Sequence, residues 1–103
     1  MIQPKVTIVI LNYNTRHFLE KFLPGVLATD YENFEVVLAD NASVDDSVEF
    51  VKTNFPDISI ISLTKNFGFA GGYNNALSKL KAEYFVLLNS DVDVPNNWLR
   101  PLV

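Results

Sequence analysis

The sequence predicts an α/β fold, a Rossmann-like parallel sheet with helices on both faces. Four short apolar runs, dense in strand formers, alternate along the chain with stretches whose apolar residues recur at helical spacing. Every run ends at a cluster of small, amide or acidic residues, and a short apolar run bounded by polar residues is typical of a buried parallel strand. With short connections and right-handed crossovers, the order β-α-β-α-β-α-β forms one domain over residues 1–103.

The first strand is expected at Val6–Leu11, where β-branched residues dominate. A helix is expected from Thr15, its N-cap, to about Ala28, because apolar residues there recur at three- and four-residue spacing. Pro24 falls inside this stretch and is expected to kink the helix or end it early. The apolar face of this helix consists of Phe18, Leu19, Phe22, Leu23 and Val26.

The second strand is expected at Phe34–Ala39 and its helix from about Val44 to Thr53. Ser43 and Asp46 have the spacing of a weak capping box, with an acid where Glu or Gln is usual. The apolar face of this helix consists of Val44, Val48 and Val51.

The last elements are a third strand at Ile58–Leu63, a third helix from about Ala70 to Lys81 and a fourth strand at Tyr84–Leu88. The fourth run is too short for an ordinary helix and rich in strand formers. Trp98 is expected to anchor the following segment in the core.

Composition excludes several classes of function. The net charge of −4 gives no general attraction for nucleic acid or anionic lipid, which both select basic surfaces. The absence of cysteine excludes disulfides and thiolate metal sites and fits a reducing cytoplasm. No stretch reaches the roughly 18 apolar residues of a membrane span. An anionic ligand would therefore be held locally, by backbone N–H groups, a lysine or a metal.

Polar clusters follow the first two strands, where ligands of open parallel sheets bind. In Asn12-Tyr13-Asn14 the amides could read a base and the tyrosine ring could stack on it. The alternative is a turn in which Asn tolerates unusual dihedrals. Asp40-Asn41 occupy a place where a side chain often selects a nucleoside, and the alternative there is helix capping.

A glycine-rich loop follows the third strand. Gly68, Gly71 and Gly72 would let the backbone approach a ligand at a helix N-terminus, beside Lys65 and Asn66. The alternative is a tight turn and a close helix–sheet contact. The spacing matches neither a dinucleotide fingerprint nor a P-loop.

The fourth strand ends at Asn89-Ser90-Asp91-Val92-Asp93. Asp91 and Asp93 would point the same way from an extended segment and could share a divalent cation. The alternative is a solvated acidic turn before Pro95. His17, early in the first helix, is expected to be a solvated helix residue.

Taken in order, these motifs resemble the nucleotide-binding half of the family 2 inverting glycosyltransferases, which have the GT-A fold. The resemblance runs from about Lys5 to Leu99, and its Asp-Asn-Ala-Ser and Gly-Phe-Ala-Gly-Gly segments are most similar to the rhamnosyltransferase-type members. Five stretches carry it: Val6–Asn14, Tyr31–Val37, Asp40–Ser47, Asn66–Asn74 and Leu87–Pro95 with Trp98-Leu99.

The resemblance implies a role for each matching residue. Tyr13 would lie against the donor base, and Asp40-Asn41 match a pair of acids whose second member contacts the pyrimidine. Asn89-Ser90-Asp91 match the family's D-x-D motif, so Asp91 would hold the Mg²⁺ or Mn²⁺ that bridges the diphosphate, with Asp93 as an additional acid. The implied nucleotide-binding residues are Tyr13, Asn14, Asp40, Asn41, Asn66, Gly68, Asn74 and Asn89.

The function implied by the resemblance is transfer of a sugar from a UDP- or dTDP-sugar to a glycan or lipid-linked acceptor, with inversion, in surface polysaccharide synthesis. The family's catalytic base lies in a second half, so no catalytic residue is assigned in this chain and the general base is expected beyond Val103. We therefore expect a chain truncated before the acceptor-binding half and inactive alone. The parent protein would be cytoplasmic or peripheral at the inner face of the membrane.

Three other interpretations compete with this resemblance. An inactive nucleotide-binding or scaffold module stays open, because Asn89 departs from the metal motif. A receiver-type signalling domain fails, because Asn12-Tyr13-Asn14 and Thr64-Lys65-Asn66 stand where that domain needs acids. An NAD-dependent enzyme is disfavoured by the missing glycine fingerprint after the first strand.

Overall fold

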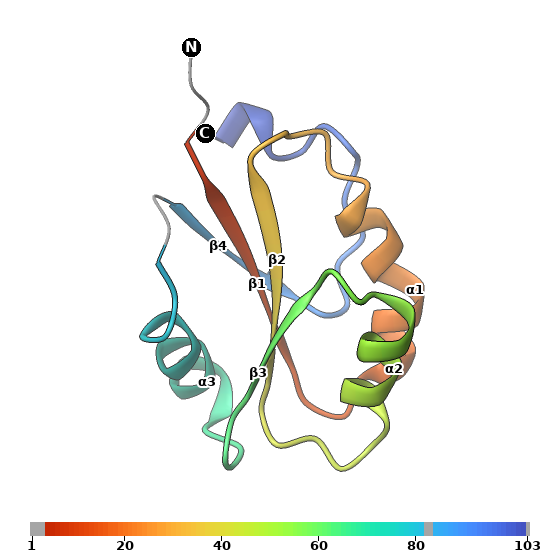
Figure 1. Cartoon of the computed structure of the whole chain (residues 1–103), viewed down its shortest axis with the longest axis vertical. Coiled ribbons are helices and arrows are strands. Elements are labelled where there is room, and N and C mark those ends of the chain that lie inside the picture. Colours follow the sequence, from red (N-terminus) through yellow and green to blue (C-terminus); the bar gives the residue numbers. More distant parts are fainter. Residues whose placement is uncertain (1–3, 82–83, 103) are drawn as a thin grey trace.

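The chain forms one four-stranded parallel sheet flanked by helices (Figure 1). The structure is a computed structural model that describes residues 4–81 and 84–102. The strand order is β3-β2-β1-β4, with β1 (Val6–Asn12), β2 (Phe34–Asp40), β3 (Ser59–Ser62) and β4 (Tyr84–Asn89). The helices are α1 (Arg16–Leu27), α2 (Ser47–Asn54), α3 (Gly68–Leu77) and the short 3₁₀ helix η1 (Arg100–Leu102). The predicted order of strands and helices is confirmed.

Parts of the domain expected over residues 1–103 lie outside the described ranges, namely residues 1–3, 82–83 and 103. The general base is expected beyond Val103, which is also outside the described residues. Its placement stays a prediction.

Helices cover both faces of the sheet, as the sequence predicts. In Figure 1, α1 and α2 lie on one side of the strands and α3 lies on the other. Side chains of β1 alternate between the two layers: Ile8 and Ile10 pack in the core with α1 and α2, whereas Val9 packs with Tyr73 and Ala76 of α3. The larger of the two cores lies beneath α1 and α2.

Strand β4 lies at one edge of the sheet and is covered on one face. Val86 and Leu88 contribute to the core under α1 and α2. Phe85 and Leu87 alternate with them, so they point to the α3 side, and there they stay exposed. Within the described residues, α3 makes its main sheet contacts with β1 and β2.

The parallel register brings the predicted polar clusters to one edge of the sheet. Asn12 at the end of β1 pairs with Asp40 at the end of β2, and Leu11 pairs with Asn89 at the end of β4. The carboxyl ends of three neighbouring strands therefore meet, and everything that follows them lies close together.

The second helix begins later than predicted. It starts at Ser47, and Val44, expected on its apolar face, is 88% exposed. The amides of Val44 and Asp45 are instead hydrogen-bonded to Asn14 Oδ1, at 2.7 and 3.3 Å, which holds this segment in a loop. The predicted capping box is also wrong, because Asp46 is the N-cap and makes no side-chain capping bond.

Helix α1 has the expected bounds, with Thr15 as its N-cap and Ala28 as its C-cap, and Pro24 does not end it early. The bounds of α3 differ from the expectation. Helix α3 spans Gly68–Leu77 rather than Ala70–Lys81, because the chain beyond Leu77 turns with shorter-range bonds such as that from the Leu80 amide to the Leu77 carbonyl.

Trp98 is half-buried and packs against the main core, as predicted, and its indole Nε1 donates to Thr29 Oγ1 at 2.9 Å. Among the described residues, no helix is long and apolar enough to cross a membrane.

Candidate functional site

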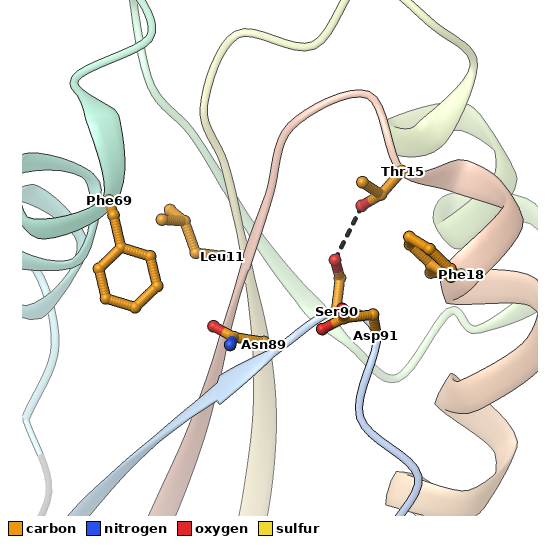
Figure 2. Close-up of a pocket in the computed structure, with 7 residues that line it drawn as sticks. All are labelled: Leu11, Thr15, Phe18, Phe69, Asn89, Ser90 and Asp91. Carbon is orange, nitrogen blue, oxygen red and sulfur yellow. Dashed lines mark hydrogen bonds between the residues drawn. The ribbon is translucent and has the colours of Figure 1, made fainter.

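A pocket opens at the carboxyl ends of β1 and β4, the point where the connections of the sheet change sides. Helix α1 leaves β1 toward one face, and α3 enters β4 from the other, so this is the topological switch point where α/β sheets bind ligands. The pocket has a volume of about 260 Å³. Figure 2 shows the residues that line it: Leu11, Thr15, Phe18, Phe69, Asn89, Ser90 and Asp91.

The pocket has apolar walls and a polar floor. In Figure 2, Phe69 of α3 lies on one side and Phe18 of α1 on the other, with the turn after β4 between them. The last residue of β4 is Asn89, and the turn supplies Ser90 and Asp91. The arrangement suits a ligand with both an apolar ring and a polar or charged group.

A buried polar network lies behind the pocket, between the ends of β1 and β2. Asn12 is fully buried and its Nδ2 donates to Asp40 Oδ1 at 2.9 Å and to Ser43 Oγ at 3.2 Å. The Ser43 hydroxyl donates to the same Asp40 oxygen at 2.7 Å and accepts from the Asn14 amide at 2.9 Å. Asp40 is thus neither free nor solvated, since it organises the exit loops of two strands.

Asn41 connects β2 to the glycine-rich segment, whose glycines lie at the start of α3 rather than in a loop. It is 2% exposed, its Oδ1 accepts from the Phe67 amide, and its Nδ2 donates to the Gly68 carbonyl, both at 3.0 Å. Gly68 adopts φ +76°, in the left-handed region that favours glycine. These bonds fix the start of α3, which carries Phe69 into the pocket.

Gly72 lets α3 approach the sheet closely. A Cβ at this position would lie 2.7 Å from Leu11 Cδ1 and 3.0 Å from Asn41 Nδ2. The expected alternative for the glycine cluster, a close helix–sheet contact, is therefore present at Gly72.

Two ionisable side chains near the site have shifted pKa values. Burial raises the pKa of Tyr73, whose hydroxyl donates to the Leu88 carbonyl at 2.9 Å and ties α3 to β4. Partial burial of Asp45 opposes its ionisation, but hydrogen bonds from the Ser47 hydroxyl and amide and from the Arg16 amide outweigh it and lower its pKa.

The structure brings only part of the predicted set of site residues into the pocket. Asn89 and Asp91 line it. Tyr13, Asn66, Gly68 and Asn74 are exposed but are not among its lining residues, while Asn14, Asp40 and Asn41 are engaged in hydrogen bonds of the loops after β1 and β2. Asp93 is not a lining residue and lies next to α1, where a Cβ at Gly25 would be 3.7 Å from its Oδ1. The two acids of the motif therefore have different surroundings.

The donor set at the pocket suits a hard cation in partnership with a ligand. No group of three or more His, Cys, Asp or Glu side chains gathers anywhere in residues 4–81 and 84–102. Asp91, with the oxygens of Asn89 and Ser90 nearby, offers one carboxylate and neutral oxygens. Mg²⁺ commonly binds through one or two carboxylates plus substrate phosphates and water, so these residues fit it without a full protein cage.

The sequence alone assigns no ligand-facing role to Leu11, Thr15, Phe18, Ser90 or Phe69. It predicts Thr15 only as an N-cap and Phe18 only as a core residue. Phe69 is 64% exposed, and its position among the glycines of the Gly68–Gly72 segment is the one signal in the sequence. The other contacts depend on how closely α1 and α3 approach β4, which spacing along the chain does not give.

Comparison with known proteins relates this chain to glycosyltransferases. The sequence model described as glycosyl transferase family 2 matches residues 7–103. A β-1,3-glucosyltransferase of Escherichia coli, WfaP, named for UDP-Glc and an α-D-GlcNAc-diphosphoundecaprenol, is 32% identical over 84% of this chain and 35% of its own length. Other relatives are covered over 32% and 15% of their lengths, so the chain spans about a third of them or less.

Solved structures with the same fold are GT-A glycosyltransferases. The mannosyltransferase PcManGT of Pyrobaculum calidifontis, in complex with GDP-Man and Mn²⁺, superposes with a TM-score of 0.83 at 28% identity, covering 92% of this chain and 30% of that one. TarS of Staphylococcus aureus has the same TM-score at 23% identity, covering 95% of this chain and 31% of the TarS chain, and at that level supports the fold alone.

Proposed function

The chain belongs to glycosyl transferase family 2, and on that premise we propose that it forms the donor side of an inverting enzyme that uses a nucleotide-diphospho-sugar. The observation that carries the proposal is the pocket at the switch point, with Asp91 on its floor. The named ligands of the structural neighbour, GDP-Man and Mn²⁺, belong to the chemical class proposed here.

The diphosphate is assigned to the turn after β4. Asp91 would hold Mg²⁺ or Mn²⁺, with Asn89 beside it, and the start of α3 at Gly68 would lie along the donor. The ion would stabilise negative charge that develops on the leaving nucleoside diphosphate. The role of the protein is to keep Asp91 at the pocket, to orient the donor and to exclude water with Phe18 and Phe69.

The nucleobase of the donor is assigned to the exposed loop after β1. Tyr13 is 46% exposed and free to stack, whereas Asp40 and Asn41 are almost fully buried and already hydrogen-bonded. We therefore assign direct stacking to Tyr13 and assign Asn14, Asp40 and Asn41 to shaping the base site from below. A UDP- or dTDP-sugar is the proposed donor, and rhamnosyl transfer is the proposed subtype.

The acceptor and the general base are assigned to a further part of the protein, beyond Val103, which is why we propose that this chain alone is inactive. Two observations support this assignment. The chain spans between 15% and 41% of the length of the relatives it matches, and Phe85 and Leu87 of edge strand β4 are exposed on the side that α3 leaves open. The proposed acceptor is a glycan or a lipid-linked sugar in surface polysaccharide synthesis. The WfaP name includes diphosphoundecaprenol, and a cytoplasmic or membrane-peripheral location would suit such an acceptor.

The test is calorimetric titration of this chain with UDP, dTDP and GDP, each with and without Mn²⁺. Asp91→Ala is the test variant, and Asp57→Ala is the matched control, because Asp57 is exposed before β3 at the other end of the sheet. Binding that requires both Mn²⁺ and Asp91, and is unchanged in Asp57→Ala, supports the donor site. Binding that is indifferent to Asp91 favours the alternative, an inactive nucleotide-binding or scaffold module.

A further inference from the structure

The Thr15 hydroxyl lies between the buried network of β1 and β2 and the turn that carries Asp91. Its Oγ1 donates to Asn12 Oδ1, and the same oxygen lies 2.9 Å from Ser90 Oγ. Figure 2 shows this second contact as a dashed line between Thr15, just before α1, and Ser90, just after β4. Thr15 thus connects elements that are 75 residues apart in the sequence.

The direction of each bond follows from the number of protons available. The two N–H groups of Asn12 Nδ2 donate to Asp40 and Ser43, so its Oδ1 is free to accept from Thr15. A threonine hydroxyl has one proton, and here it goes to Asn12. Ser90 must therefore be the donor to Thr15, and the chain of donors runs from Ser90 through Thr15 and Asn12 to the Asp40 carboxylate.

We infer that Thr15 is a positioning residue that fixes the Asn89-Ser90-Asp91 turn so that Asp91 faces the pocket. The inference rests on the proposed function, because it gives Asp91 the task of holding the metal and diphosphate. Within residues 4–81 and 84–102, the bond to Thr15 is the one side-chain hydrogen bond made by this turn. Without it, the turn would be held by its backbone and by the packing of its neighbours.

The network behind Thr15 explains why the anchor is firm. Thr15 is half-buried, Asn12 is fully buried and Asp40 is 3% exposed, so rearranging any of them leaves a buried polar atom without a partner. The anchor for the proposed metal ligand is thus set by the ends of β1 and β2, although the ligand itself follows β4. Removing a side chain that orients a metal ligand by a hydrogen bond typically lowers metal affinity by about 10- to 100-fold.

The test compares Thr15→Val, which keeps the shape and removes the hydroxyl, with Thr15→Ser, which keeps the hydroxyl. Thr53→Val is the matched control, because Thr53 is exposed near the end of α2. The dissociation constant for UDP in the presence of Mn²⁺ is measured by calorimetry on folded protein. We expect Thr15→Val to weaken binding about 10-fold, whereas Thr15→Ser and Thr53→Val keep the wild-type affinity.

A double-mutant cycle with Ser90→Ala separates a bridge from two independent effects. If Ser90 acts through Thr15, the double variant loses no more affinity than either single variant, whereas additive losses overturn the inference. Ser90→Ala also serves if Thr15→Val does not fold, because it removes the donor and leaves the Thr15–Asn12 bond in place.

A ligand-free readout distinguishes failure of this inference from failure of the proposed function. In ¹H–¹⁵N spectra, Thr15→Val should shift the amides of Ser90 and Asp91, and Thr15→Ser should not. If wild type binds UDP in an Asp91-dependent way but Thr15→Val binds equally well, the positioning role is overturned and the donor site stands. If wild type does not bind, the proposed function fails in this chain, and unshifted Ser90 and Asp91 amides in Thr15→Val overturn the bridge as well.

Discussion

Replacing Asn41 by aspartate is a strong test of the structure because it changes one NH₂ group into an oxygen. Asn41 is 2% exposed and uses both ends of its amide: Oδ1 accepts from the Phe67 amide and Nδ2 donates to the Gly68 carbonyl. Aspartate keeps the first bond. It loses the second bond, because a carboxylate oxygen then faces the Gly68 carbonyl oxygen at the position where Nδ2 now lies 3.0 Å from it.

The expected cost at pH 7 is about 2 kcal/mol of unfolding free energy. Leaving a buried acceptor unsatisfied costs about 1–3 kcal/mol, and the Gly68 loop is only partly buried, which lowers this cost. Burial of the new carboxylate next to Asp40 adds to it and raises the pKa of the new acid above its unfolded value of about 3.9. For a domain of this size, 2 kcal/mol lowers Tm by about 10 °C.

The loss of unfolding free energy in Asn41→Asp should grow as pH rises. Between the unfolded and the folded pKa of the new acid, the native state binds more protons, so stability falls as pH rises through this window and then levels off. Below about pH 4 the protonated acid can again donate to the Gly68 carbonyl. Asn41→Asp should therefore approach wild type near pH 4 and lie furthest from it at pH 7.

The assay is urea unfolding followed by circular dichroism, at pH 4 and pH 7, on wild type, Asn41→Asp and the exposed control Asn97→Asp. The control should differ little from wild type at either pH. Asn41→Asp with wild-type stability at pH 7, or with the same loss of stability at both pH values, would refute the hydrogen bonding of the Asn41 amide to the start of α3.

Three further predictions concern stability. Gly68→Ala should lose about 1 kcal/mol because φ is +76°, although a Cβ there would meet no atom within 4 Å, so equal stability in thermal unfolding would contradict a strained backbone. Leu38→Ala should lose about 2–5 kcal/mol, because Leu38 of β2 is fully buried in the core under α1 and α2; a loss below 1 kcal/mol in urea would mean that the core can collapse around the gap. Asp45→Asn should lose less than about 1 kcal/mol at pH 7, since Asp45 is exposed. Its folded pKa is lowered, so the difference from wild type should vanish as pH falls through that pKa, and a difference that persists at pH 2 would contradict it.

Most of the fold could be predicted because burial dominates it. β1 and β2 are almost continuous runs of buried residues, and such runs are recognisable in a single sequence. The start of α2 could not be predicted in the same way, because Val44 lies at helical spacing and has an ordinary apolar side chain. Its amide is instead bound by Asn14, 30 positions away, and this interaction between two loops decides where the helix begins.

The candidate site was predictable as a place more than as a set of contacts. Polar clusters after three neighbouring strands had to meet once the sheet was parallel, and Asp91 and Asn89 do line the pocket. The sequence predicts that Asp91 and Asp93 point the same way, but alternation holds only in a regular strand, and β4 ends at Asn89. The roles of Thr15 and Phe69 depend on the distance between helices and strand ends, which a one-dimensional pattern does not contain.

The close approach of α3 at Gly72 means that one side chain serves two surfaces. Leu11 packs with its methyl groups against the helix at Gly72, and it is also a wall of the pocket. A methyl group added at residue 72 would press on Leu11 and also on Asn41 Nδ2, and Leu11 could yield only into the pocket that it lines. The volume available to a ligand therefore depends in part on Gly72, which does not line the pocket. A larger residue at position 72 would therefore act on the pocket through Leu11 and on the start of α3 through Asn41.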